Sequence, residues 1–200
     1  LSQYQKILWV EPNHQLALFQ KALCFYQLGY LNDSKLTFKN ILLLNPGHYN
    51  SIYYLALIEY ETQKFEDSIP LFLSLLETSR NHEIYNYLGN AYYNINNLKL
   101  SLKAYQHSIK LNPYNADIYY QIGVIYEQLL QPDEAIKNYK QAVDMDNNNP
   151  DLIYRLGVLL YEDAQFKKSL EYLRRYIIHN SKDIEVLEIL GIPGAGPAGV

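Results

Sequence analysis

The stretch that decides the fold runs from His82 to Asn115 and reads HEIYNYLGNAYYNINNLKLSLKAYQHSIKLNPYN. Apolar residues recur in it at helical spacing in two blocks, and a largely polar segment at 94–97 separates them. The stretch is therefore predicted to form two helices joined by a short turn. One such hairpin cannot bury its own apolar face, so it needs copies of itself on either side.

The chain supplies those copies at a spacing of 34 residues, as between His82 and Ala116. Five complete copies are predicted, and they cover residues 15–48, 49–81, 82–115, 116–149 and 150–183. The second copy is one residue short. Partial copies are expected at both ends, where 1–14 would be the second half of an earlier copy and 184–191 the start of another. We therefore expect the chain to be a segment of a longer array.

Small residues hold the eighth and twentieth positions of the copies, where they would let the two helices of a hairpin approach closely. The eighth residues are Ala22, Ala56, Gly89, Gly123 and Gly157, and the twentieth are Ser34, Ser68, Ser101, Ala135 and Ser169. Pro46 and Pro113 are predicted to stop second helices, and Pro70 is expected in the first turn of another. The asparagines that precede the first helices are predicted to cap them, namely Asn13, Asn81, Asn115 and Asn149.

This pattern resembles the tetratricopeptide repeat family. The spacing and the order of residues (an aromatic residue or Leu, then Leu-Gly, Tyr, Ala, Phe or Tyr, and Pro) are those of that family, and the resemblance covers about residues 1–191. It implies an all-α fold of tandem helix-turn-helix repeats stacked as a right-handed superhelical α-solenoid.

The composition excludes several classes of function. A net charge of −4 argues against nucleic acid or an anionic membrane as a partner, and no apolar run is long enough to span a bilayer. The single cysteine, Cys24, excludes an internal disulfide and fits a reducing, cytoplasmic compartment. The 21 tyrosines, against 1 Trp and 1 Met, indicate surfaces that are partly buried and partly hydrated.

No residues with the spacing of a catalytic or metal site are found. His14, His48 and His82 lie one repeat apart, so they are predicted to be turn residues that do not converge on a metal. Cys24 has apolar neighbours and no evident His or Asp partner, and we expect it to be buried and structural. The chain is therefore predicted to be no enzyme and to need no cofactor.

The tail contains one formal motif, G-x-G-x-x-G, from Gly194 to Gly199, which looks like the opening of flavin-binding domains. Such a loop needs a preceding strand and a following helix, and the pattern predicts neither. Residues 192–200 are therefore expected to be a linker or an artefact.

The resemblance implies that the first helices line a concave groove that binds a partner. Carried over to this chain, the groove residues are Tyr53, Tyr54, Tyr60, Asn86, Tyr87, Asn90, Tyr93, Tyr120, Gln121, Glu127, Tyr154, Arg155 and Tyr161. Four further tyrosines hold marker positions and are assigned to the core: Tyr92, Tyr105, Tyr126 and Tyr139. Tyrosine offers a large contact area with a hydrogen-bonding tip, which suits a binding surface.

The groove positions are also acidic. They hold Glu61, Glu83, Asp117, Glu127, Asp151, Glu162, Glu185 and Glu188, against the single base Arg155. Part of this excess has a structural reason, because carboxylates in the first turn of a helix favour the helix dipole. The partner is expected to be a protein or peptide segment that is basic rather than acidic.

Two named subclasses of the family fit poorly. The repeats that clamp a carboxylate terminus keep Asn90 and Arg155, but Asn86, Gln121 and Asp151 replace the other clamp residues. The asparagine-ladder repeats need Asn in every copy, and only the third copy has them in the groove.

Three alternatives stay open. The array could be the accessory domain of an enzyme whose catalytic part lies elsewhere, or it could self-associate through its uncapped ends. A helical-repeat RNA binder would need a basic groove and is disfavoured.

Overall fold

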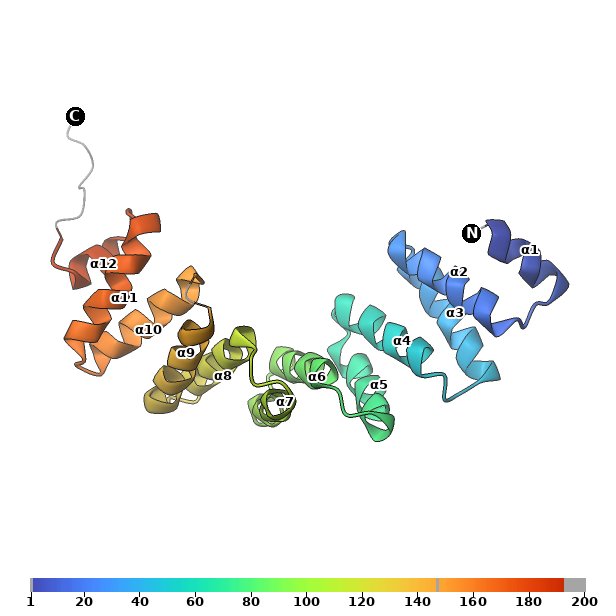
Figure 1. Ribbon diagram of the computed structural model, residues 1–200, viewed down its shortest axis with the longest axis horizontal. Coiled ribbons are helices and arrows are strands. Elements are labelled where there is room, and N and C mark those ends of the chain that lie inside the picture. The colour runs from blue at the N-terminus through green and yellow to red at the C-terminus, as the bar shows by residue number, and fades with distance from the viewer. Residues whose placement is uncertain (1, 147, 193–200) are drawn as a thin grey trace, which may run out of the picture. The chain divides into compact units, whose positions relative to one another are not determined.

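The computed structural model describes residues 2–146 and 148–192, and these form helices joined by short turns (Figure 1). The helices are α1 (Ser2–Val10), α2 (Gln15–Gln27), α3 (Leu31–Leu44), α4 (Tyr49–Glu61), α5 (Phe65–Thr78), α6 (His82–Asn94), α7 (Leu98–Leu111), α8 (Ala116–Gln128), α9 (Pro132–Met145), α10 (Pro150–Glu162), α11 (Phe166–His179) and α12 (Ile184–Ile189). No strand occurs within those two ranges. The predicted all-α class of helical repeats is confirmed.

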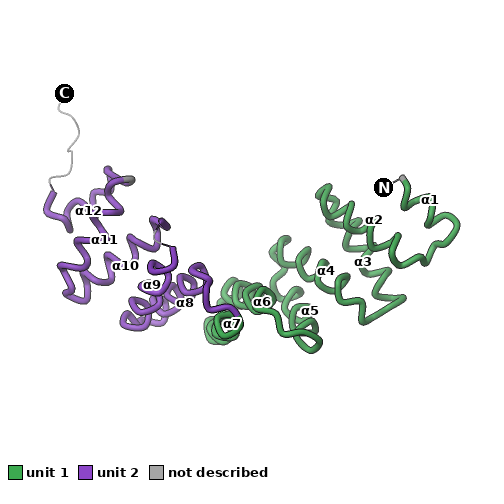
Figure 2. Tube along the Cα trace, in the orientation of Figure 1, with its two compact units in different colours: residues 1–111 green, residues 112–200 purple. Residues whose placement is uncertain are grey.

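The chain divides into two compact units, residues 1–111 and 112–200 (Figure 2). Unit 1 contains the hairpins α2–α3, α4–α5 and α6–α7, and unit 2 contains α8–α9 and α10–α11. The first helix of each hairpin begins at residue 15, 49, 82, 116 or 150, which are the residues where the predicted copies begin. The boundaries of the copies as domains stay a prediction, because the compact units divide the chain after Leu111.

Side-chain caps start the first helices. Asn81, Asn115 and Asn149 each accept a hydrogen bond from a backbone N–H in the next turn, as predicted. The predicted cap at Asn13 is wrong. His14 is the residue directly before α2, and its Nδ1 accepts from the nitrogen of Ala17 at 3.2 Å.

The equal spacing of three histidines does not give them equal places. His48 caps α4 as His14 caps α2, and its Nδ1 lies 3.2 Å from the nitrogen of Ser51. His82 is instead the first residue of α6, because the second copy is one residue short. Its carbonyl oxygen accepts from the hydroxyl of Ser108 at 2.8 Å.

Glycine allows the two helices of a hairpin to touch. A Cβ atom on Gly89 would lie 2.4 Å from the ring of Tyr105, and one on Gly123 would lie equally close to the ring of Tyr139. The twentieth residue adds a hydrogen bond, since Ser101 Oγ donates to the Gly89 carbonyl at 2.8 Å. The predicted role of the small residues is therefore confirmed. The serine hydroxyl also adds a hydrogen bond between the two helices.

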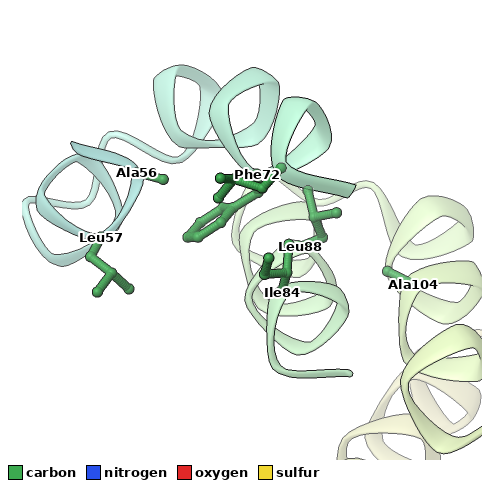
Figure 3. Close-up of a cluster of buried hydrophobic side chains, with 7 residues drawn as sticks. Ala56, Leu57, Phe72, Ile84, Leu88 and Ala104 are labelled. Atoms are coloured by element: carbon green, nitrogen blue, oxygen red, sulfur yellow. The ribbon is translucent and has the colours of Figure 1, made fainter. Parts of the chain in front are cut away.

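The cores of the hairpins lie between helices of neighbouring pairs. In unit 1, Phe72 points from α5 towards the space between α4 and α6, where Leu57 and Ile84 lie (Figure 3). Phe72 is fully buried, as are Tyr105 and Tyr139 in the equivalent place of their helices. The assignment of these two tyrosines to the core is confirmed, whereas Tyr92 and Tyr126 are half-buried.

Two residues differ from expectation. Pro70 is the sixth residue of α5 and not in its first turn, so it removes the hydrogen bond that the Glu66 carbonyl would otherwise receive. Cys24 is half-buried and not fully buried.

Among the described residues, no helix is long and apolar enough to cross a membrane. The glycine-rich motif at 194–199 lies outside the described residues.

Candidate binding surface

The predicted groove residues lie on the first helices of the hairpins. In each unit by itself we call the side formed by these helices the first-helix face: α2, α4 and α6 in unit 1, and α8, α10 and α12 in unit 2. In unit 1 this face is aromatic and well packed. Tyr54 stacks on Phe38 of the preceding hairpin with ring centroids 5.5 Å apart and planes at 8°. Tyr87 stacks on Phe72 at 5.2 Å and 1°. Both tyrosines therefore join consecutive hairpins in addition to any role towards a partner.

Other predicted residues of unit 1 surround these stacks. The ring of Tyr60 contacts that of Tyr87 edge to face with centroids 5.2 Å apart, and the rings of Tyr53 and Tyr54 make the same kind of contact with centroids 5.6 Å apart. Burial, followed by the nearby Tyr87, raises the pKa of Tyr53 to about 12. Asn90 accepts a hydrogen bond from the hydroxyl of the buried Tyr105. Two more predicted residues are half-buried on α6, Asn86 and Tyr93.

Unit 2 replaces the aromatic stacks with a network of charges. Arg155 of α10 donates from Nε to Asp151 Oδ2 at 2.9 Å and from Nη1 to Glu127 Oε2 at 3.0 Å. The hydroxyl of Tyr120 donates to Asp151, and that of Tyr139 donates to Glu127. One guanidinium therefore serves two carboxylates that belong to successive first helices.

The network shifts the ionisation of its members. Burial opposes the ionisation of Asp151, but hydrogen bonds from Tyr120 and Arg155 outweigh it and lower its pKa. Burial, together with the hydrogen bond to Asp151, raises the pKa of Tyr120 to about 12. Burial and the bond to Glu127 also raise the pKa of Tyr139. Both carboxylates are thus acceptors held by neutral tyrosines and one cation.

Tyrosine also links successive first helices at a fixed spacing. Tyr120 donates to Asp151, and Tyr154 donates to Glu185 at 3.2 Å, each across 31 positions. The donor is the fifth residue of one first helix and the acceptor is the second residue of the next. In α2 the fifth residue is Phe19, which has no hydroxyl, and the second residue of α4 is Asn50. The sequence prediction missed this pairing, although a Tyr-to-acid spacing of 31 could have signalled it.

Two hollows open beside α10 in unit 2. The first has a volume of about 380 Å³ and lies between α10 and α12. The second measures about 400 Å³ and lies between α10 and the turn after α8. Glu162 lines both, and among the residues that the structure describes no basic side chain lines either. We call the first one the acidic hollow and define it by Val158, Tyr161, Glu162, Glu185, Glu188 and Ile189.

The structure brings some predicted residues together and leaves others apart. Tyr161 lines the acidic hollow, and Glu127 lines the second hollow. The ring of Tyr154 contacts that of Tyr176 in α11 with centroids 5.1 Å apart, and Gln121 is half-buried on α8. Within the described residues, no cluster of three His, Cys, Asp or Glu side chains could hold a metal ion. The arrangement offers contacts and charge.

Comparison with known proteins agrees with this geometry. A family model described as TPR repeat matches residues 89–129 and 131–163. A search of curated proteins by sequence finds no match. Solved structures match over most of the chain. One is YrrB, described as a TPR protein with an unusual peptide-binding site: it is 17% identical, the TM-score is 0.77, and the match covers 94% of this chain and 98% of that one.

Two further structures show the same fold. MamA matches with 18% identity and a TM-score of 0.75, over 86% of this chain and 94% of its own. A thermophilic TPR protein in Thermus thermophilus, TTC0263, matches with 20% identity and a TM-score of 0.53, over 88% of this chain and 97% of its own. At these identities the likeness concerns the fold.

Helical hairpins that follow one another and pack in sequence define a helical-repeat protein. Residues 89–129 and 131–163 match the tetratricopeptide repeat, as the sequence pattern predicts, and the fold of the chain is that of tetratricopeptide repeat proteins. Proteins with such repeats bind protein or peptide partners. The repeats therefore support a role as an interaction scaffold, and this fold is generally non-catalytic.

Proposed function

We propose that the chain is a scaffold that binds a basic segment of another protein on its first-helix face, and that unit 2 supplies most of the charge recognition. The observation that carries this proposal is the acidic hollow, in which three exposed glutamates lie beside an aromatic ring and no base is found among the described lining residues. A lysine or arginine of the partner would place its alkyl stem on Tyr161 and Ile189 and its charge among the carboxylates.

The neighbouring network supports the same charge preference. Arg155 is the only base among the predicted groove residues, and Asp151 and Glu127 already engage it. The carboxylate of Glu185 accepts a hydrogen bond from Tyr154, which orients it without cancelling its charge. Acidic partners would therefore meet carboxylates, while the guanidinium of Arg155 is already engaged.

Basic side chains of unit 2 lie mainly on the second helices. Examples are Lys137 and Lys140 of α9 and Lys167 and Lys168 of α11. This distribution separates the charges of each hairpin, so the first-helix face keeps its negative potential. The resemblance in fold to YrrB, whose description includes a peptide-binding site, agrees with a peptide as the occupant.

The experiment titrates the full chain with short labelled peptides that share alternate leucines and carry lysine, glutamate or glutamine between them. The lysine peptide should bind most tightly, and added salt should weaken it because exposed charges are screened. Replacement of the hollow's acids, Glu162→Gln, Glu185→Gln and Glu188→Gln together, should weaken the lysine peptide by about tenfold or more.

A matched control removes the same number of charges from second helices. Glu66→Gln, Glu171→Gln and Asp133→Asn replace residues that are exposed on α5, α11 and α9. This variant should bind the lysine peptide within about twofold of the unaltered chain. An equal loss of affinity in both variants would mean that overall charge, and not the acidic hollow, attracts the lysine peptide, and this would overturn the proposal. Preference for the glutamate peptide would overturn it as well.

A further inference from the structure

Unit 1 has a hollow of its own on the side of the second helices, away from its first-helix face. It has a volume of about 460 Å³ and lies between the second helices α5 and α7, with α6 as its floor. Leu73 and Leu76 line one wall, Leu100 lines the other, and Leu88 lies at the floor. We call it the apolar hollow.

The floor helix separates this site from the predicted groove. Tyr85, Leu88 and Tyr92 of α6 line the apolar hollow and follow helical spacing. Tyr87 and Asn90 of the same helix face the aromatic contacts of the first-helix face. The two surfaces of unit 1 are therefore distinct, and the apolar hollow does not depend on the function proposed above.

One small residue opens the hollow. Ala104 is the seventh residue of α7 and projects towards α6 (Figure 3). The seventh residue of α5 is Leu71 and that of α11 is Tyr172, which are both much larger. Alanine leaves that space empty at the third hairpin, and the apolar surface continues outwards onto Leu73 and Leu100, which are 44% and 38% exposed.

The two walls of the hollow carry opposite charge. Helix α5 contains the acids Glu66, Asp67 and Glu77 and no base. Helix α7 contains three lysines and His107 and no acid. Glu77 lies at the rim on one side, and Lys103 and His107 lie at the rim on the other, where His107 stacks on Tyr85 at 5.0 Å.

We propose that the apolar hollow binds an amphipathic helical segment of a partner protein, with an acidic flank along α7 and a basic flank along α5. Apolar side chains one turn apart would fill the space beside Ala104 and cover Leu73 and Leu100. The charged rims on both sides match an elongated partner with two different flanks, because a small apolar ligand would leave the exposed leucines uncovered.

The experiment uses the full chain and three labelled helical peptides of about 18 residues, or five turns. They share one stripe of leucines and differ in their flanks, which carry glutamate on one side and lysine on the other, glutamate on both, or lysine on both. The mixed peptide should bind saturably and about tenfold more tightly than either uniform peptide, because only it satisfies both walls.

Substitutions locate the binding. The pair Leu73→Gln and Leu100→Gln should weaken the mixed peptide by about tenfold, because it removes two apolar contacts. The matched pair Leu36→Gln and Leu43→Gln alters leucines of α3 that are 60% and 81% exposed, and it should leave the affinity unchanged. Ala104→Leu, which fills the hollow, should act like the first pair and provides a second test should one variant fold poorly.

Charge reversal gives the sharpest readout. Glu77→Lys makes both rims basic, so the peptide with glutamate on both flanks should become the tightest ligand. The same titrations in the chain with Glu162→Gln, Glu185→Gln and Glu188→Gln remove the acidic hollow of unit 2 as a competing site for lysine flanks. Affinity of the mixed peptide should be unchanged there, so this proposal and the earlier one fail independently. Equal binding of all three peptides, loss in the α3 control, or binding only of a small apolar dye would overturn the proposal.

Discussion

The sixth residue of a first helix is used in two ways in the two units. In unit 1 it is Tyr54 in α4 and Tyr87 in α6, and each stacks flat on a phenylalanine of the preceding hairpin. In unit 2 it is Arg155 in α10, which bridges Asp151 and Glu127. The same backbone position thus joins hairpins through an apolar stack in one unit and through exchangeable charges in the other.

This difference shows which surface of each unit stays accessible to a partner. An aromatic stack covers the face of the ring, so the tyrosines of unit 1 contribute to the contact between hairpins. A charge network leaves carboxylates at the surface, where their interactions respond to salt and to a charged ligand. The fold of the repeat is common to both units, and in α4, α6 and α10 the side chain at the sixth position decides which of these contacts forms.

The largest expected effect is the loss of an aromatic joint. Phe72→Ala should destabilise unit 1 by about 3–5 kcal/mol, because it empties a fully buried site and leaves Tyr87 and Tyr60 without their partner. The effect should not depend on salt. Hydrogen exchange of the full chain measures the loss of protection separately in the two units. A larger increase in exchange in unit 2 than in unit 1 would contradict a stabilising role of Phe72 within unit 1.

The next effect compares two close helix contacts. Gly89→Ala should destabilise by about 1–3 kcal/mol, because its Cβ would meet the rigid ring of Tyr105. Gly157→Ala should cost less, since the atoms it meets are Cδ2 and Cγ of Leu173, whose side chain can change rotamer. Chemical denaturation of both variants makes the comparison, and an equal or larger loss at Gly157 would contradict it.

A smaller effect tests the charged joint. Arg155→Gln should destabilise unit 2 by about 1 kcal/mol or less at low salt, because its ion pairs are partly exposed. At about 1 M salt the difference should nearly vanish, since the Debye length falls to about 3 Å. Denaturation at the two salt concentrations measures this, and a loss that persists at high salt would show a packing role instead.

The smallest effect is a dependence on pH. The folded state raises the pKa of Tyr120 to about 12, so its contribution to stability is complete below about pH 10 and is lost as the pH rises through about 12. Tyr120→Phe should flatten the fall in stability over that interval. The folded state lowers the pKa of Asp151, so its contribution is present above about pH 4 and is lost on acidification. An unchanged alkaline slope in the variant, measured by denaturation at several pH values, would contradict the role of Tyr120.

Much of the fold follows from spacing in the sequence. The small residues at the eighth position could be predicted because two helices joined by a short turn must meet at a fixed register, and Gly89 and Gly123 confirm it. The cap at His14 could not, since asparagine at the preceding position is the commoner capping residue and only backbone geometry decides between them.

The surface was less predictable than the fold. Whether Tyr87 faces solvent or stacks on Phe72 depends on the register between hairpins, which is a tertiary property. The bonds from Tyr120 and Tyr154 to acids of the next first helix likewise appear only once successive hairpins are packed. The apolar hollow arises from what Ala104 lacks, and a missing side chain gives no periodic signal in the sequence.

The most direct test of the proposed function maps a lysine-bearing peptide onto the full chain by NMR chemical-shift perturbation. The expected result is saturable perturbation of residues 158–162 and 185–189, which line the acidic hollow, with weaker changes at Tyr53 and Tyr87. Perturbation confined to the aromatic face of unit 1, or none at the acidic hollow at saturation, would contradict the assignment of charge recognition to unit 2.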